Sequence, residues 1–436
     1  MMKKGLGIGW QEVLLKNMRK TSMLHYVQID EDLCNGCVLC MKACPTKAIR
    51  IRHGRVARIE GICIDCGECI RVCTRGAIKV IPAGKDLSSM TRHAIMSVSP
   101  VLYSQFGDNV MPNDLLLALR KVFKYVYDQS SANELCNAAT ELYLKENRAK
   151  EGTTWPLISP SCPVVNRLIA HRFPSLFKHI LPIITPREIA AKRLREGLHL
   201  EGIPEAKDIG IFHITSCSAE RISIKEPMFL KSSYLSGAVG LNDAYPLIKK
   251  QIENIDGGTM LHRSSGVGIG WAVSGGEIAG LDSGSFLAVS GIPETLRYLE
   301  RIEMGLLSDI EYVELRACPG GCVGGSMIVT DRYLAKHTVQ RLVRMFGEEK
   351  RVKSPEVEAA YQAGWFFSAK KSLPQVDESW RLAVDEAIKR QQKVEETLQL
   401  LPEKECGACG SPDCRTFAED VVDGTNSLKN CVFKSK

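Results

Sequence analysis

The sequence predicts several domains: an α+β domain at the N-terminus, an α/β domain in the middle, a helical segment and a small cysteine-containing module at the C-terminus. Three observations lead to this prediction. Cysteines gather in groups at both ends of the chain, apolar runs alternate with helical periodicity between them, and a heptad pattern follows. With 436 residues, 44% of them hydrophobic and 25% charged, the chain is long enough for two to four domains.

Eight cysteines near the N-terminus form two runs with C-x2-C-x2-C-x3-C spacing, the first followed by a proline. This spacing binds pairs of 4Fe-4S clusters, and the fourth cysteine of each run ligates the other cluster. An isolated C-x2-C pair also fits zinc or a disulfide, but two equivalent runs of four thiols fit neither. The runs predict one cluster held by Cys34, Cys37, Cys40 and Cys73, and a second held by Cys63, Cys66, Cys69 and Cys44.

Short strands are expected beside these runs. Residues 26–32 and 47–59 alternate apolar and polar side chains, and Gly54 is placed for a hairpin turn. The sequence therefore predicts a ferredoxin-like α+β domain over residues 24–82, preceded by a tail over residues 1–23.

An α/β domain is predicted over residues 83–350. The apolar runs 209–212 and 286–289 are typical of buried strands, and segments 114–126 and 187–199 have helical periodicity.

A helical linker is predicted over residues 351–401. Positions spaced alternately four and three apart form a heptad seam between residues 377 and 401, namely Trp380, Val384, Ala387, Gln391, Val394, Leu398 and Leu401. Two interpretations stay open: the helix docks on the preceding domain, or residues 377–401 form a homodimeric coiled coil.

The final segment, residues 402–436, brings four more thiols together in the sequence: Cys406, Cys409, Cys414 and Cys431. Its glycines and Pro412 allow the tight turns that metal ligation needs. A further 4Fe-4S cluster is expected here, with zinc as a stronger competitor than for the first eight cysteines.

Four cysteines in the middle of the chain are far apart in sequence: Cys162, Cys217, Cys318 and Cys322. Three flanking sequences link them, S-P-S-C-P at 159–163, I-T-S-C-S at 214–218 and R-A-C-P-G-G-C-V-G-G at 316–325. Prolines and glycines around cysteines favour sharp turns, where the backbone can approach a bulky inorganic group. These flanks suggest a common site.

With these motifs, residues 24–345 resemble the FeFe hydrogenase family. The stretch 317–325 is similar to the family's third cluster-binding motif, Ser161 to Pro163 to the first, and Ser216 to Ala219 to the second. The glycine-rich run 264–276 resembles a signature near the active cluster. The C-terminal module is similar to one appended to sensory relatives of these enzymes.

The resemblance implies cofactors and a reaction. Cys162, Cys217, Cys318 and Cys322 would bind the 4Fe-4S half of the H-cluster, and Cys322 would bridge to a two-iron subsite. The full set would be four 4Fe-4S clusters and one two-iron subsite. The reaction would be H2 = 2 H+ + 2 e−, with electrons relayed through the ferredoxin-like domain.

Several positions depart from the family pattern. Ser161 replaces a proton-relay cysteine, and a hydroxyl is a weaker acid than a thiol. Thr215 replaces a methionine, and Glu220 replaces a lysine that contacts an iron cyanide. Beside an anionic cluster Glu220 should be repulsive unless it is protonated, turned away, or compensated by Arg221 or Lys225. We assign catalytic positions to Cys322, Ser161 and Glu220.

Three further positions stand out. Arg316 replaces a family methionine, and Ser223 occupies the place of an expected glutamate. Cys136 is the one cysteine outside the four groups, and its default interpretation is a small buried apolar residue.

Two function classes follow. The first is a slow, sensory or regulatory hydrogenase with a redox partner such as ferredoxin or a separate signalling protein. The second is a non-catalytic redox relay with a plain 4Fe-4S cluster at the hydrogenase site. The net charge of +7 without a basic tract argues against nucleic-acid binding. We expect a cytoplasmic protein of an anaerobic cell, with no membrane span.

Overall fold

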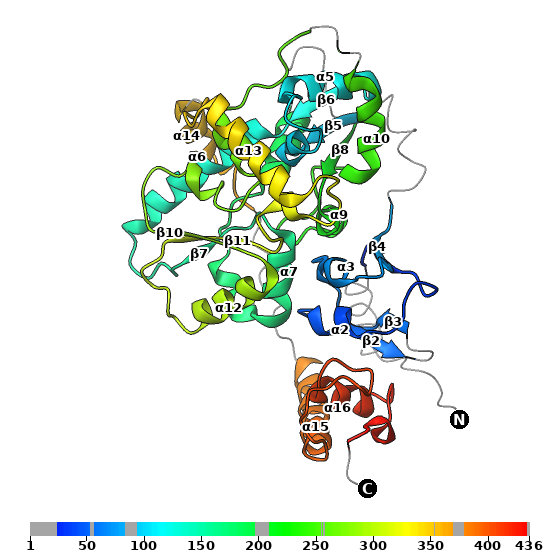
Figure 1. The fold of residues 1–436 in the computed structure, drawn as a ribbon. Coiled ribbons are helices and arrows are strands. Elements are labelled where there is room, and N and C mark those ends of the chain that lie inside the picture. The colour runs from blue at the N-terminus through cyan, green and yellow to red at the C-terminus, as the bar shows by residue number, and fades with distance from the viewer. Residues whose placement is uncertain are drawn as a thin grey trace, which may run out of the picture. The chain divides into compact units, whose positions relative to one another are not determined.

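The computed structural model describes residues 24–52, 56–82, 94–196, 209–253, 255, 258–352, 354–368 and 379–433 (Figure 1). The chain falls into two compact units. The first contains the described residues within 1–64, 68–79 and 372–436, and the second those within 65–67 and 80–371. The N-terminal ferredoxin-like domain and the C-terminal module therefore belong to one unit.

The N-terminal part of the first unit has four short strands. β1 (Val27–Ile29) pairs with β4 (Ile78–Val80), and β2 (Ile49–Arg52) pairs antiparallel with β3 (Val56–Ile59). Two short helices, α2 (Leu39–Ala43) and α3 (Glu68–Val72), carry cysteines between the strands. The strands and the α+β class are as predicted, while the turn at Gly54 lies outside the described residues.

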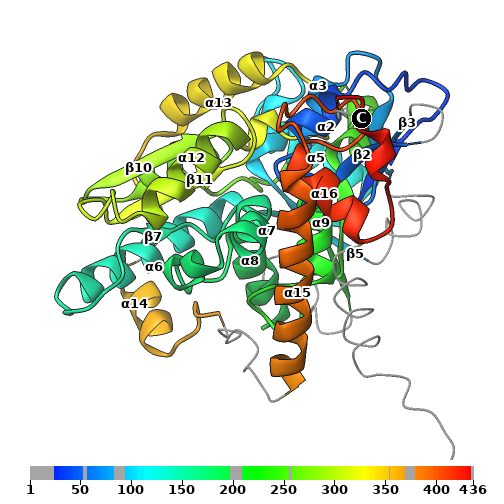
Figure 2. The same ribbon diagram turned by 90° about the horizontal axis from the view of Figure 1, so that it is seen from below.

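The C-terminal part of the same unit contains two helices and a 3-10 turn, α15 (Ser379–Gln399), α16 (Cys414–Val422) and η6 (Leu428–Asn430). The helices α15 and α16 lie side by side (Figure 2). Val394 and Leu401 of the heptad seam are buried against Phe417 and Ala418, with Leu398 beside them. The C-terminal end of the seam thus packs on the module that follows it, whereas Ala387 and Gln391 are exposed and the side chains of Trp380 and Val384 are not among those described.

The second unit is built on two parallel sheets, in agreement with the predicted α/β class. The larger sheet has the strand order β6-β5-β8-β9, and the smaller β10-β11-β7. The bounds of these strands are β5 Ala94–Val98, β6 Tyr125–Asp128, β7 Leu157–Ile158, β8 Gly210–Thr215, β9 Gly237–Gly240, β10 Phe286–Ser290 and β11 Tyr312–Arg316. The predicted strands at 209–212 and 286–289 correspond to β8 and β10.

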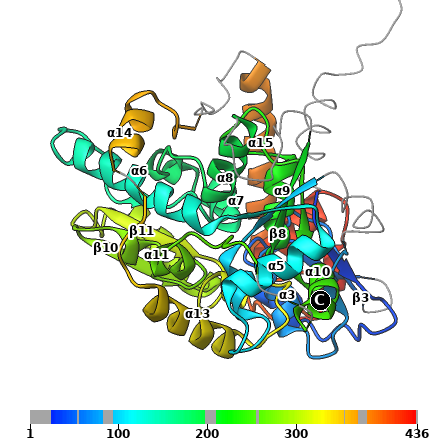
Figure 3. The same ribbon diagram turned by 90° about the horizontal axis from the view of Figure 1, so that it is seen from above.

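Helices cover both faces of the larger sheet. Successive residues of β5 point to opposite faces, so neighbouring side chains pack against different helices. Met96 packs in a core with side chains of α5 (Pro112–Val122) and α10 (Leu241–Ile252). Ile95 packs in a second core with α6 (Ser130–Arg148) and α8 (Pro186–Arg195). Figure 3 shows these helices around the strands. The helices expected at 114–126 and 187–199 are α5 and α8, and α5 ends earlier because the chain becomes extended at Phe123 before β6.

The remaining elements of this unit connect the strands. They are η2 (Pro100–Ser104), α7 (Pro163–Arg172), η3 (Pro174–His179), α9 (Ser218–Lys225), α11 (Gly266–Gly270), η4 (Ile278–Gly280), α12 (Ile292–Glu303), η5 (Cys322–Gly324), α13 (Arg332–Phe346) and α14 (Ser354–Gln362). No helix in the described part of the chain has the length and apolar character needed to cross a membrane.

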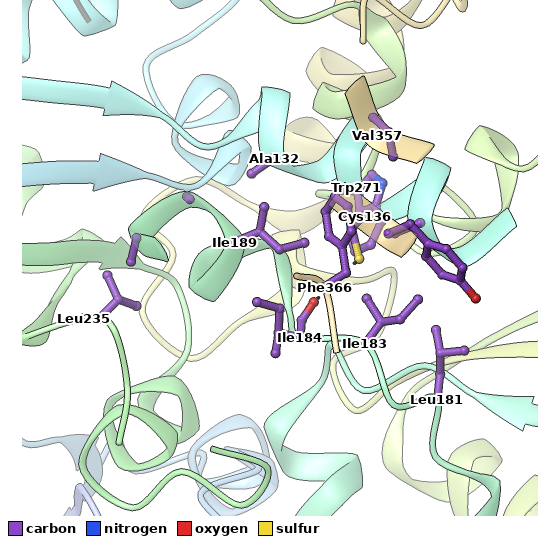
Figure 4. Close-up of a cluster of buried hydrophobic side chains, with 14 of the residues drawn as sticks. Ala132, Cys136, Leu181, Ile183, Ile184, Ile189, Leu235, Trp271, Val357 and Phe366 are labelled. Atoms are coloured by element: carbon purple, nitrogen blue, oxygen red, sulfur yellow. Dashed lines mark hydrogen bonds between the residues drawn. The ribbon is translucent and has the colours of Figure 1, made fainter. Parts of the chain in front are cut away.

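Cys136 lies in the core formed by α6, α8 and their neighbours. It is 2% exposed and sits among Ile184, Ile189, Trp271 and Phe366 (Figure 4). Its Sγ lies 3.9 Å from the carbonyl oxygen of Ile184, and burial raises the pKa of the thiol. Cys136 is therefore a packed core residue, as its default interpretation predicted.

Candidate functional site

The three cysteine motifs of the middle domain follow the carboxyl ends of parallel strands. Cys162 comes after β7 and is the N-cap of α7, and Cys217 comes after β8 and is the N-cap of α9. Cys318 follows the end of β11 by two residues. Open α/β sheets bind their ligands beyond the carboxyl ends of their strands. The fold thus carries cysteines that are distant in sequence to one place.

Backbone contacts join the second and third motifs to the glycine-rich run. The Ser216 hydroxyl donates to the carbonyl of Cys322 at 3.0 Å, and the Ser274 N–H donates to the carbonyl of Gly320 at 2.9 Å. Gly321 has φ +102°, and a Cβ there would come within 2.4 Å of the Ser274 nitrogen. Only glycine fits such a position, so the third motif can fold tightly against the run that we expected near the cluster.

The four thiols interact electrostatically. Burial, Glu220, Cys318 and Cys162 raise the pKa of Cys217. Burial raises the pKa of Cys322 to about 12, with Glu220, Cys318 and Cys162 acting in the same direction and Arg316 opposing them. Thiols of this kind stay protonated when free, and only metal binding would deprotonate them. Four cysteine thiols that interact with one another fit the soft donor set of a 4Fe-4S cluster.

Glu220 is ionised and held by basic neighbours. Its carboxylate lies 3.5 Å from Nη1 of Arg187 and 3.6 Å from Nε2 of His213, and it accepts a hydrogen bond from the Thr215 hydroxyl. Burial opposes ionisation, but His213, Arg187 and Thr215 together lower the pKa of Glu220 to about 2. Compensation thus comes from Arg187 and His213, which the sequence did not suggest, while Nη1 of Arg221 donates to the carbonyl of Ile81.

Arg316 is the second buried cation of the site. Its Nη2 lies 2.6 Å from Glu277 and its Nε 3.1 Å from Glu314. Glu277 also accepts hydrogen bonds from the Tyr312 hydroxyl at 2.6 Å and the Ser159 hydroxyl at 2.7 Å. Burial, with the nearby Glu314, raises the pKa of Glu277, while the two carboxylates outweigh burial and keep Arg316 charged by raising its pKa.

The charge of Arg316 also reaches the cysteines. It interacts electrostatically with Cys322 and Cys162, and it lowers the pKa of Cys322 where Glu220 raises it. Cys322 therefore lies between electrostatic fields of opposite sign. Arg316, in the third motif, favours negative charge at Cys322, whereas Glu220, in the second motif, opposes it.

Ser161 and Ser223 occupy different roles in this network. The Ser161 side chain is buried, and its hydroxyl has no hydrogen-bond partner among the described residues, although its N–H donates to Ser159. Ser223 accepts a hydrogen bond from Nη2 of Arg187 at 3.1 Å and donates to the carbonyl of Glu220. Ser161 is thus the hydroxyl left free for a bound group, whereas Ser223 positions Arg187.

Part of the first eight cysteines is brought together in the structure. Cys34, Cys37, Cys40 and Cys73 line one hollow. Burial and the neighbouring Cys34 raise the pKa of Cys40 to about 11. The thiol of Cys69 interacts with Cys63 and Cys44, and also with Cys40. The ligand assignment itself stays a prediction.

The C-terminal cysteines form a fourth group. Cys409 and Cys414 each interact electrostatically with Cys406 and Cys431. Across the described residues, no three His, Cys, Asp or Glu side chains are placed to share a single metal ion.

Charged residues outside the sequence motifs complete the site and were not predicted. Arg187 and His213 lie on α8 and β8, and Glu277 directly follows the glycine-rich run. A charged residue on an otherwise apolar helix face was the available indication for Arg187, which is 7% exposed.

Three family models match the chain. The model of the iron only hydrogenase large subunit, C-terminal domain, matches residues 92–281, and a 4Fe-4S dicluster domain matches residues 26–74. A model named for an Fe-S cluster matches residues 401–433. The matched segments contain three of the four cysteine groups in full and Cys162 and Cys217 of the middle group, whereas Cys318 and Cys322 lie beyond the hydrogenase match.

Relatives are distant. The chain is 20% identical over 329 residues to the NADP-reducing hydrogenase subunit HndD of Solidesulfovibrio fructosivorans, covering 61% of this chain and 56% of that protein. The chain thus spans little more than half of that relative. An FeFe hydrogenase HydA1 from Chlamydomonas reinhardtii aligns with TM-score 0.48 and 15% identity, over 62% of this chain and 89% of the other. A second FeFe hydrogenase structure aligns with TM-score 0.49 and 13% identity, over 66% of this chain and 95% of the other. The family models thus assign an FeFe-hydrogenase-like domain to residues 92–281, with iron-sulfur domains on either side of it.

Proposed function

We propose that the protein reacts with H2 at an H-cluster, in the reaction H2 = 2 H+ + 2 e−, and that it does so slowly in a sensory or regulatory role. The observation that supports this most directly is the meeting of Cys162, Cys217, Cys318 and Cys322 beyond the strand ends, with the free hydroxyl of Ser161 beside them. When bound, the two-iron subsite would supply the open iron at which H2 is split or formed.

The protein residues would hold the cofactor and set its charge environment. Four thiolates and an anionic cofactor repel one another in a buried site, so cations are required nearby. Arg316 supplies one toward Cys322, while Arg187 neutralises Glu220. The helix N-termini that begin after Cys162 and Cys217 add partial positive charge.

Proton transfer would be the step that limits the rate of hydrogen turnover. Ser161 would exchange a proton with the bound cofactor, and its hydroxyl is a much weaker acid than a thiol. Behind it, Ser159 links the N–H of Ser161 to the buried carboxyl of Glu277. Burial raises the pKa of Glu277, while the ion pair with Arg316 opposes that rise.

The proposed domains divide the work. Residues 24–82 would hold two 4Fe-4S clusters, residues 83–350 the H-cluster, and residues 402–436 a fourth 4Fe-4S cluster, with residues 351–401 as a helical linker. Electrons would pass to a redox partner such as ferredoxin or to a separate signalling protein. We propose a cytoplasmic location, because exposed clusters of this kind are oxygen-sensitive.

Hydrogen turnover should depend on Cys322. In protein matured anaerobically with the two-iron subsite, Cys322→Ser should abolish hydrogen oxidation with a viologen dye, because the bridging thiolate is lost. The matched control is Cys136→Ala, which removes a thiol from the apolar core and should retain activity. Equal hydrogen oxidation by Cys322→Ser and the unmodified protein would contradict the bridging role of Cys322, and no hydrogen oxidation by the loaded, unmodified protein would favour the plain 4Fe-4S relay.

Ser161→Cys should raise turnover, because a thiol exchanges protons near neutral pH more readily than a hydroxyl. The expected increase is at least about tenfold, which is a fraction of the roughly hundredfold to ten-thousandfold contribution of general acid–base catalysis. Ser161→Ala should lower turnover below that of the unmodified protein, because it removes the hydroxyl. Unchanged rates in both variants, with the subsite shown by infrared bands to be present, would mean that protons take another route.

Arg187→Met should destabilise the protein by about 3–5 kcal/mol, because it leaves the Glu220 carboxylate buried without its cation. The double variant Arg187→Met/Glu220→Gln should recover most of this loss, since both charges are then absent. Urea unfolding of the single and double variants measures the coupling between them. Additive effects of the two substitutions would show that the pair does not interact.

A further inference from the structure

The Cys406–Cys409 loop packs directly against the N-terminal ferredoxin-like domain within the first unit. Gly407 has φ +76°, and a Cβ there would lie 2.9 Å from Met41 Cε and 3.1 Å from Lys42 Cε. Both residues belong to α2, the helix that carries Cys40. The ammonium group of Lys42 donates to the carbonyls of Glu405 and Pro412, on either side of the loop. The cysteine loop is thus fixed on α2.

Strand β2 makes the second contact. The N–H of Ile51 donates to the carbonyl of Gly410 at 2.9 Å, and a Cβ on Gly410 would lie 2.1 Å from the Ile51 oxygen. Ile51 also lines the hollow that contains Cys34, Cys37, Cys40 and Cys73, and it lines a second hollow together with Cys409. One residue therefore borders both cysteine groups.

A buried ion pair holds these surfaces together. The carboxylate of Asp420 accepts from Nε of Arg50 at 2.8 Å, from Nη2 of Arg52 at 3.0 Å and from the Ser411 hydroxyl at 2.6 Å. The side chains of Asp420, Arg50 and Arg52 are each about a tenth exposed. Arginine pairs that are this enclosed fix geometry, and breaking one is costly. Lys47 adds an ion pair with Asp413 at 2.5 Å.

From these contacts we infer that the C-terminal cysteine module is an electron port coupled directly to the cluster site of Cys34, Cys37, Cys40 and Cys73. The inference rests on the proposal that both groups hold 4Fe-4S clusters. The C-terminal cysteines would hold a cluster that accepts one electron from a low-potential one-electron carrier protein. That electron would then pass to the oxidised cluster held by the N-terminal cysteines, with no bond made or broken and no proton required. Electron tunnelling favours this route because the two sites share a border.

Electron paramagnetic resonance of the full-length, cluster-loaded protein reduced with dithionite tests this inference. The unmodified protein should show spin–spin broadening between the C-terminal cluster and its neighbour. Cys409→Ala, which removes a C-terminal ligand, should sharpen the remaining cluster signals and defines the uncoupled reference. Unchanged line shapes in Cys409→Ala, together with the loss of the C-terminal cluster's iron, would overturn the inference.

Asp420→Asn tests the ion pair itself. It should weaken the broadening while the iron content per chain stays constant, because the docking charge is lost and the cysteines are retained. The matched control is Asp423→Asn, which breaks the half-exposed pair with Arg390 at 2.7 Å and should leave the spectrum unchanged. If Asp420→Asn fails to load the C-terminal cluster, the comparison of the unmodified protein with Cys409→Ala still decides. These spectra need neither H2 nor the two-iron subsite, so they are independent of hydrogen turnover.

Discussion

The arrangement of the middle domain depends on one constraint, the gathering of four cysteine thiols whose negative charges would repel one another if they ionised. Burial raises the pKa of Cys322 to about 12 and also raises the pKa of Cys217, so these two thiols do not ionise unaided. The fold meets this constraint with strand ends that bring the motifs together, glycines that let Gly321 approach the Ser274 backbone, and helices that begin after Cys162 and Cys217. Bound iron would complete the site by replacing protons on sulfur.

The charged side chains of this site are paired with buried partners of opposite charge. A carboxylate at Glu220 would be unfavourable beside an anionic group, yet Arg187 and His213 keep it ionised within a local network. Arg316 supplies the positive field at Cys322 from another motif and is itself held by Glu277 and Glu314. Glu220 and Arg316, which depart from the family pattern, therefore each belong to an ion-paired group. This pairing favours a site with adjusted electrostatics over one that has lost its function.

The sequence predicted what local patterns encode and missed what the tertiary fold supplies. Periodicity predicted β8, β10 and α8 to within a few residues. Spacing indicated the cysteine groups at the two ends of the chain, and the flanking sequences indicated the middle group. Arg187 could not be found, because it reaches Glu220 from 33 positions away through the packing of α8. The docking of Asp420 on Arg50 was equally hidden, since 370 positions separate the partners. The heptad seam indicated a buried helix face but not the surface that covers it.

Infrared spectroscopy tests the central claim most directly. The protein would be matured anaerobically with a synthetic two-iron complex, and carbon monoxide and cyanide stretches would be recorded before and after exposure to H2. The account predicts bands that shift under H2, since the four thiols and Ser161 would hold a subsite that reacts with hydrogen. An absence of bands in protein that contains the iron of four 4Fe-4S clusters would contradict it, and would make Cys322 an ordinary ligand of an electron-relay cluster.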